Sequence, residues 1–474
     1  MKVQTTKLYR GGWAGAVQCL HVHPCCSVIR IARYKPCRHY PDAVIVEATG
    51  YRIPIVKTIL ILFPKDWDRD ELAHPRFEGR FRFVYEGFDL FKFPENARLL
   101  AFDARRFIDR LAAKYRGHID GVISNNEHFG ALIAAALARR LGLPGTAPEV
   151  VIAAQHKYYA RCILQKVAPE ATPRYSVFPY AIERREEVGI NFPLFVKPVK
   201  ATYSVLARRI DNFAQLKTHL TFSWLEKLVL DRLIKPFNDL MPLYTPFDIN
   251  AAHMIAEEMM DGVQLNVDGY VHNGKVKVLG IVDEVMYPGT QAFMRFEYPS
   301  RLPLDARAKI SALTEKILTG FDYDYGFFNI ELMYQPETGA IRVIEINPRM
   351  ASQISNLYRR VDGCDPYEMA VALALGDAPR FEAGQGEFNT AASFVFRRFD
   401  GRGVNSVPSR AQIDAIHQRY PDARLMLYMK KGNGLAREMK WLGSHRYAVL
   451  NLGGKSEQDL FERYERIRTE LAFD

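Results

Sequence analysis

Two glutamates and one asparagine stand in a segment whose pattern predicts a β-hairpin, and their oxygens suit a divalent metal. Residues 327–333 and 341–346 are apolar and rich in β-branched and aromatic side chains, with Pro, Thr and Gly between them. Side chains alternate along a strand, so Glu345 and Asn347 share a face, and an in-register hairpin brings Glu331 beside them. Because Mg²⁺ prefers such hard oxygen ligands, we predict that these three side chains bind Mg²⁺ or Mn²⁺.

The surroundings of the two glutamates argue against an ordinary surface role. Most charged side chains on strands are solvated, and each glutamate alone fits that description. Both, however, lie inside apolar runs, where a carboxylate is costly unless a positive group meets it. The pair therefore favours a bound cation.

This segment and three others, in order along the chain, resemble the ATP-grasp superfamily. Glu331 and the run from Glu345 to Arg349 resemble the metal-binding end of that family. The other elements are residues 155–157, similar to its earlier phosphate lysine, 193–198, similar to its nucleotide-binding lysine strand, and 256–262, similar to its adenine hinge. Four correctly ordered elements make the resemblance specific, and it covers roughly residues 120 to 380.

The resemblance implies roles for individual residues. Arg349 and Lys197 would be catalytic, and the planar guanidinium of Arg349 suits a transferred phosphoryl group or a carboxylate. Glu127, in a polar loop after a predicted strand, would face the site. The nucleotide-binding residues implied are Lys157, Lys197, Thr202, Ser204, Glu257, Glu258, Met260 and Gln264, with the backbone of Glu258 and Met260 at the adenine and Gln264 at the ribose.

The activity implied is ATP-dependent ligation of a small carboxylic acid to an amine, of the amino-acid or dipeptide type. The acid would become an acyl phosphate, and an amide or peptide bond would form with release of ADP and phosphate, using ATP and Mg²⁺. One alternative is a biotin-carboxylase-like carboxylase component that uses bicarbonate. Another is a regulatory module that binds nucleotide without turnover, because residues 200–204 lack the glycines of the family's phosphate loop.

The implied fold class is α/β, with α+β lobes. The expected parts are an N-terminal pre-grasp α/β domain at 1–148, a small ATP-grasp lid lobe at 149–262, and a large lobe with a C-terminal α+β extension at 263–474. The segment 221–250 has helical spacing and looks like an insertion in the lid domain. We expect strands near 43–47, 56–63, 119–124, 174–178, 192–198, 255–260, 265–270, 275–285, 388–399, 423–430 and 448–452, and helices near 104–115, 130–141, 155–165 and 456–470.

The composition argues against several other classes. The hydrophobic share of 48% and charged share of 25% over 474 residues are typical of a globular chain with two or three domains. The net charge of +10 comes from scattered Lys and Arg without a nucleic-acid motif. We therefore expect an anionic nucleotide rather than a nucleic acid as partner; failure to retain any oligonucleotide would dispose of the nucleic-acid alternative. No apolar run approaches the roughly 18 residues of a membrane span, so we expect no membrane partner.

The six cysteines and the opening segment predict a cytoplasmic protein with reduced thiols. Met1 to Leu20 lacks the charged and apolar regions of a secretory leader. The cluster from His21 to Cys26 has no second ligand pair at zinc-finger spacing, so we expect it to be incidental. A homodimer is compatible with these patterns.

Overall fold

The protein is described by a computed structural model that covers residues 36–37, 40–44, 56–90, 92, 94–201, 206–404, 406–428, 435–436, 438–439, 443–471 and 473. It forms two compact units, Met1–Val56 and Lys57–Asp474. In the first unit, β1 (Pro36–Cys37) and β2 (Tyr40–Val44) pair antiparallel. The strand expected at 43–47 therefore overlaps β2 and then leaves the described residues, and the cluster from His21 to Cys26 lies outside them.

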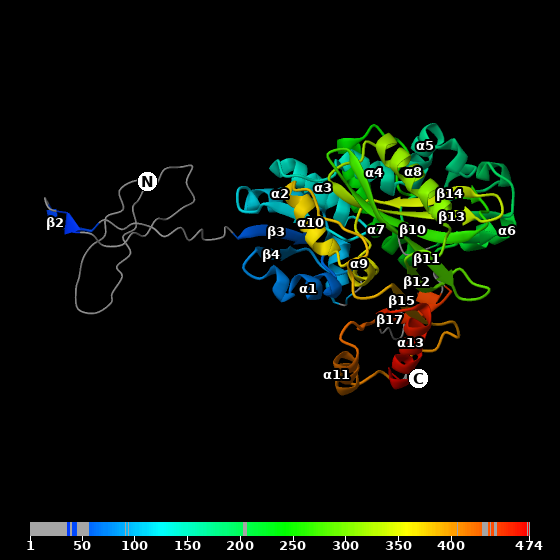
Figure 1. Ribbon diagram of the computed structural model, residues 1–474. Helices are drawn as coiled ribbons and strands as arrows, with labels where there is room; N and C mark the ends of the chain where they lie inside the picture. Colours follow the sequence, from blue (N-terminus) through cyan, green and yellow to red (C-terminus); the bar gives the residue numbers. More distant parts are fainter. Residues whose placement is uncertain are drawn as a thin grey trace. The chain divides into compact units, whose positions relative to one another are not determined.

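The second unit opens with a small parallel α/β layer. Its three-stranded sheet has the order β4-β3-β5, formed by β3 (Lys57–Leu62), β4 (Phe81–Glu86) and β5 (Gly121–Ile123). Parallel neighbours need crossovers, and helices supply them here. The helices of this layer are α1 (Asp66–Leu72), α2 (Ala104–Tyr115), α3 (Gly130–Leu141) and, from much later in the chain, α10 (Pro366–Leu375), which packs on β5 (Figure 1). The strands and helices expected between residues 56 and 141 are confirmed.

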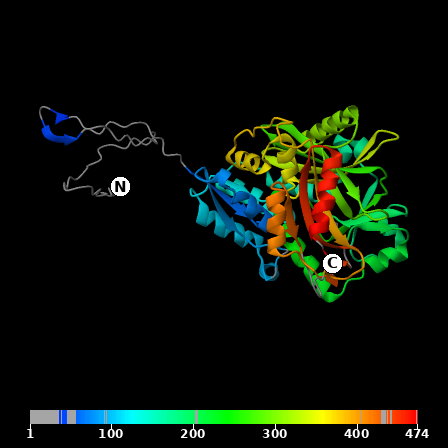
Figure 2. The ribbon, with the colours of Figure 1, turned by 60° about the horizontal axis from the view of Figure 1, so that its bottom comes forward.

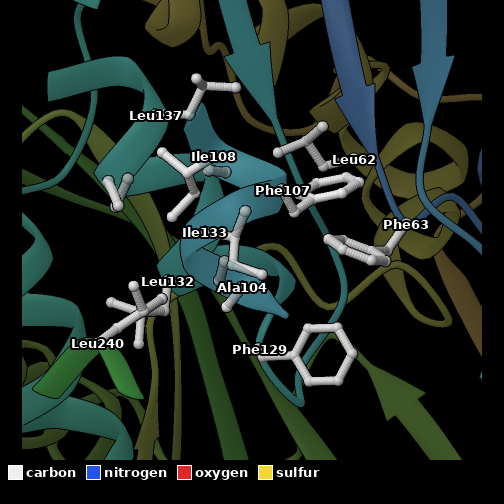
Figure 3. Packing of buried hydrophobic residues seen from close by; sticks show 14 of the residues in the cluster. Leu62, Phe63, Ala104, Phe107, Ile108, Phe129, Leu132, Ile133, Leu137 and Leu240 are labelled. Carbon is white, nitrogen blue, oxygen red and sulfur yellow. The ribbon is translucent and has the colours of Figure 1, made fainter. Parts of the chain in front are cut away.

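Aromatic and aliphatic side chains close the core of this layer (Figure 3). The ring of Phe63 lies 5.5 Å from that of Phe88 and 5.1 Å from that of Phe129, both edge to face. Helix α7 (Trp224–Tyr244) adds Phe237 and Leu240 to the same core and contacts α2 and α4. The sequence predicted this helix but placed it in the lid domain; the structure shows it packed on the first α/β layer, because its buried face matches that aromatic core.

A four-stranded antiparallel sheet follows, with the order β6-β9-β7-β8. Its strands are β6 (Tyr175–Pro179), β7 (Leu194–Pro198), β8 (Arg208–Ile210) and β9 (His253–Glu258), and α6 (Phe213–His219) packs beside β8. The expected helix at 155–165 is divided, because His156 has extended backbone angles between α4 (Pro148–Gln155) and α5 (Lys157–Val167). Lys157 is therefore the first residue of a helix.

The largest element is an eight-stranded antiparallel sheet with the order β14-β13-β10-β11-β12-β15-β17-β16. Its strands are β10 (Val263–His272), β11 (Lys275–Met286), β12 (Phe293–Tyr298), β13 (Gly326–Gln335), β14 (Ala340–Asn347), β15 (Thr390–Arg398), β16 (Arg424–Leu427) and β17 (His445–Gly454). Helices α8 (Leu304–Gly320), α9 (Ser355–Asp362), α11 (Arg410–Arg419) and α13 (Glu457–Leu471) complete this part, and Figure 2 shows α13, in red, against the last strands. The strands and the final helix expected here are confirmed.

The two faces of this sheet differ along β10, β11, β13 and β14. On one face Leu265, Phe328 and Ile346 pack in the core shared with α5 and α8. The alternate positions face the other way, and several carry polar or charged side chains. This second face, which α9 and α10 cover further along, holds the metal ligands expected from the sequence.

The predicted hairpin is present, with one irregularity. Asn329 pairs with Asn347 and Glu331 with Glu345, but Leu332 pairs with Val343, so Ile344 is an extra residue on β14. Such a bulge leaves one residue outside the ladder and redirects its backbone groups. The carbonyl of Ile344 is consequently available to side chains of other elements.

The domain boundaries expected at 148 and 262 stay predictions, since the compact-unit division falls at Val56 and Lys57 and separates nothing further. Among the described helices, none is both long and apolar enough to span a membrane.

Candidate active site

The polar face of the large sheet carries a continuous hydrogen-bonded array. The Asn329 amide donates to Asn266 Oδ1 at 2.6 Å and to Asp268 Oδ1 at 3.0 Å. Asn266 in turn donates to Glu284, and Tyr358 donates to Asp268 at 2.7 Å. Asn266 is 4% and Asp268 3% exposed, so neither is a surface residue. The fold does not require polar or charged side chains at these buried positions of the sheet. Their presence therefore indicates that they support a ligand site.

The predicted metal ligands lie together at the edge of this array. Asn347 donates amide hydrogen bonds to Glu345 Oε1 and Asn329 Oδ1, both at 3.2 Å. Burial and the adjacent Glu345 raise the pKa of Glu331 to about 8. Burial would also raise the pKa of Glu345, but Lys157 and Lys197 offset it and hold that pKa at about 2. The nearby cations therefore do not compensate the negative charge of Glu331 and Glu345 together.

This donor set fits a magnesium ion. Within the described part of the chain, no three His, Cys, Asp or Glu side chains are placed to hold a metal, so Glu331 and Glu345 would need Asn347 as the third ligand. Mg²⁺ takes few protein ligands and completes its octahedron with water and phosphate oxygens. A divalent cation would also relieve the repulsion that raises the pKa of Glu331.

Two lysines and an arginine surround the bulge in β14. Lys157 Nζ lies 2.9 Å from Glu345 Oε2, and Lys197 Nζ lies 2.9 Å from Glu257 Oε2. Lys197 also donates to the Ile344 carbonyl at 3.1 Å, and Arg161 donates to it at 2.8 Å. The bulge therefore joins the lysine strand β7 to the metal-ligand strand β14.

Arg349 and Glu127, expected at the site from separate parts of the sequence, form an ion pair of 2.7 Å. Burial would raise the pKa of Glu127, but Arg349 and other cations hold it below its ordinary value. Lys200 joins this pair, because its Nζ donates to the Glu127 carbonyl at 3.0 Å. The polar loop before α3 is thereby tied to the ends of β7 and β14.

The residues expected around the nucleotide fall into two groups. Glu257 is fully buried, and its other oxygen pairs with Arg161 at 2.8 Å, so its side chain neutralises the Lys197 cluster. Glu258 pairs with Arg174 at 2.7 Å, and the half-buried Met260 follows the end of β9. Gln264 lies in β10, opposite Glu284 in the register. Thr202 and Ser204 lie outside the described residues.

Sequence reasoning missed three charged side chains that the fold brings to the site. Arg161 is four residues after Lys157 on α5, so helical periodicity alone places it on the same side. Lys200 follows the lysine strand by two residues, and Glu284 lies on the strand next to the array. Burial and the charge of Glu331 raise the pKa of Glu284 well above its ordinary range. Two arginines of α9 do not join this cluster, because Arg359 pairs with Glu71 and Arg360 with Asp422.

Comparison with known proteins shows what this fold and part of this sequence resemble. Residues 190–356 match the model of the ATP-grasp domain family. Its fold resembles that of the L-amino acid ligase from Bacillus licheniformis, with a TM-score of 0.61 and 17% identity over 88% of this chain and 98% of that one. It also resembles biotin carboxylase from Campylobacter jejuni, with a TM-score of 0.55 and 13% identity over 88% and 92%.

One curated protein is also similar to this chain in sequence. Carnosine synthase 1 of Gallus gallus is 26% identical over 261 residues, which are 52% of this chain and 26% of the relative. The chain thus spans about a quarter of the length of this curated relative.

Proposed function

We propose that the protein is an ATP-dependent ligase that joins a carboxylic acid to an amine through an acyl phosphate. The observation that carries the proposal is the convergence of Glu331 and Glu345 with Lys157 and Lys197 at one bulged strand. Paired carboxylates suit a divalent metal, and lysines suit the phosphates of a nucleotide. A site with both parts is suited to phosphoryl transfer.

The first step would be attack of the acid's carboxylate oxygen on the γ-phosphorus of ATP. The bond between that phosphorus and the β-phosphate oxygen breaks, and ADP leaves. Lys157 and Lys197 would neutralise the phosphates. Arg349, which is 8% exposed and held by Glu127, is placed to orient the acid or the moving phosphoryl group. Bound Mg²⁺, held by Glu331, Glu345 and Asn347, would supply charge neutralisation at the phosphate oxygens.

The second step would be attack of a neutral amine on the acyl carbon, with loss of phosphate and of one amine proton. The similarity to an L-amino acid ligase and to carnosine synthase supports amino acids as acid and amine. The buried polar array of Asn266, Asp268 and Glu284 gives a lining that suits polar and cationic substrate groups.

The test is a screen of phosphate release over pairs of amino acids, with the product identified by mass spectrometry. We expect ADP and a dipeptide-like amide in equal amounts, only when acid, amine, ATP and Mg²⁺ are all present. Bicarbonate belongs in the same panel, because the likeness to biotin carboxylase supports a carboxylating alternative. Bicarbonate-dependent ADP release without an amide would favour that alternative, and tight ATP binding without any turnover would favour a regulatory module.

A further inference from the structure

Lys200 differs from the other cations of the site in how it is held. Lys157, Lys197 and Arg349 each lie within 2.9 Å of a carboxylate oxygen. Among the ion pairs of the described residues, none involves Lys200. Lys200 nevertheless lies in the same site, because it contacts Glu127, the partner of Arg349. Its ammonium group is held by the carbonyl of Glu127 instead, at 3.0 Å.

The position of Lys200 is set by three distant segments of the chain. It follows β7, it donates to the loop before α3, and its Nζ lies 5.7 Å from the ring centre of Phe237 on α7. The residue is 7% exposed. A buried ammonium beside an aromatic face and one carbonyl has only part of the negative charge that it needs.

The charged groups around Lys200 come from every neighbouring element. Burial acts first, and then Lys157 on α5 and Arg349 after β14 oppose a positive charge, whereas Glu345 and Glu127 favour it. Together they lower the pKa of Lys200 to about 7. His128, in the same loop as Glu127, is also within electrostatic range. An anion at this place would meet a cation that the protein alone does not neutralise.

We propose that Lys200 binds the polyphosphate of ATP and takes up a proton from solvent when the nucleotide binds. The inference rests on the proposed function in one respect, namely that ATP enters this site. Polyphosphate oxygens would supply the charge that Lys200 lacks, and the ammonium form would then prevail. The proton passes from the buffer to Nζ, and no bond of the nucleotide is broken.

Isothermal titration calorimetry in buffers of different ionisation enthalpy gives the number of protons taken up when the nucleotide binds. At pH 8, with a non-hydrolysable ATP analogue and Mg²⁺, we expect Lys200 to take up about 0.9 proton per nucleotide, since a group with a pKa near 7 is then mostly neutral. Glu331, with a pKa of about 8, gives up its proton when Mg²⁺ binds in the wild type and in the Lys200 variants alike, so the uptake at Lys200 is the difference between them. At pH 6 the uptake at Lys200 should fall to about 0.1. AMP, which has no polyphosphate, should cause no uptake.

Two variants test whether Lys200 binds phosphate or only holds the loop of Glu127 in place. Lys200→Arg keeps a permanent charge, so at pH 8 it should bind the analogue with about 0.9 proton less uptake than the wild type. Lys200→Met should weaken binding by about tenfold to a hundredfold. Lys316→Met, at a surface lysine that pairs with Glu170, is the matched control and should behave like the wild type.

The outcomes are distinguishable. Equal proton uptake in the wild type and Lys200→Arg, uptake with AMP, or unchanged affinity in a folded Lys200→Met variant would overturn the role of Lys200. Absence of any nucleotide binding by the wild type would instead overturn the proposed function. Because Lys200→Arg retains the charge, the proton count decides the question even if Lys200→Met does not fold.

Discussion

The aromatic core around Phe63 and the carboxylate pair of Glu331 and Glu345 are two buried regions built on opposite rules. In the first, rings meet edge to face and apolar side chains fill the space between α2, α3 and α7. In the second, like charges face each other across a strand pair, and burial raises the pKa of Glu331 to about 8. The aromatic core stabilises the fold without a ligand, whereas the carboxylate pair gains its full stabilisation only when a cation binds.

The comparison predicts different consequences for substitutions of similar size. A change in the aromatic core should lower the free energy of unfolding. A change in the carboxylate pair should lower turnover while leaving the fold intact or more stable.

Phe129→Ala should have the largest effect, on stability. Phe129 is fully buried and contacts Phe63, Phe88 and Phe102, so its loss leaves a cavity in the core. We expect the free energy of unfolding to fall by about 3–5 kcal/mol, measured by urea denaturation. Leu304→Ala, at a side chain that is 76% exposed, is the control and should change it by less than about 0.5 kcal/mol. A similar loss in both variants would contradict the distinction.

Glu345→Gln should have the next largest effect, which is a loss of turnover. The change keeps the side-chain shape but removes one charge from the pair, so we expect phosphate release to fall by about a hundredfold or more, equivalent to about 3 kcal/mol. Circular dichroism should show an unchanged fold. Glu337→Gln, in the exposed turn of the same hairpin, is the matched control and should retain normal rates. Near-normal activity of Glu345→Gln would refute the metal assignment.

Glu284→Gln should increase stability by a smaller amount. Burial and the charge of Glu331 raise the folded-state pKa of Glu284 above its unfolded value. Folding therefore binds a proton, and stability is lost as pH rises above the unfolded pKa toward the folded one. Glutamine has no such proton to bind, so we expect the variant to be more stable than the wild type at pH 8.

Urea denaturation of Glu284→Gln in EDTA, at pH 5 and pH 8, gives the measurement. The gain over the wild type should be smaller at pH 5, because the unfolded carboxyl is then closer to its own pKa. A variant less stable than the wild type at both pH values would show that the negative charge at this position is compensated in the free protein.

Thiol alkylation should have the smallest effect. Among the described side chains, Cys162 and Cys364 form no disulfide, and burial followed by Asp362 and Asp365 raises the pKa of Cys364 to about 12. A thiol with so little thiolate reacts slowly. We expect alkylation under native conditions to leave ATP-dependent turnover within about twofold of normal. Complete loss, restored by replacing one cysteine with serine, would reveal a functional thiol.

Local patterns predicted much of this molecule because they depend on neighbouring residues. The hairpin of β13 and β14 follows from two apolar runs and a turn, and its register brought Glu331 opposite Glu345 as expected. The helices α2 and α3 begin and end at the predicted residues. Periodicity and turn chemistry act within a few residues, so the sequence alone contains them.

Contacts between distant segments could not be predicted in the same way. The bulge at Ile344, which offers its carbonyl to Arg161 and Lys197, depends on how β14 meets α5 and β7. The packing of α7 on the first layer depends on an aromatic core assembled from several elements. The sequence shows that Lys200 follows the lysine strand. Its burial against Glu127 and Phe237 depends on tertiary contacts that the sequence does not show.

The proposed ligase reaction requires that the γ-phosphoryl group of ATP passes to a carboxylate at this site. Hydroxylamine intercepts acyl phosphates, so the test is a reaction of a substrate acid, ATP, Mg²⁺ and hydroxylamine, with nucleotides separated by chromatography. We predict a hydroxamate formed together with equal amounts of ADP and phosphate. Formation of AMP and pyrophosphate with the hydroxamate would contradict γ-phosphoryl transfer.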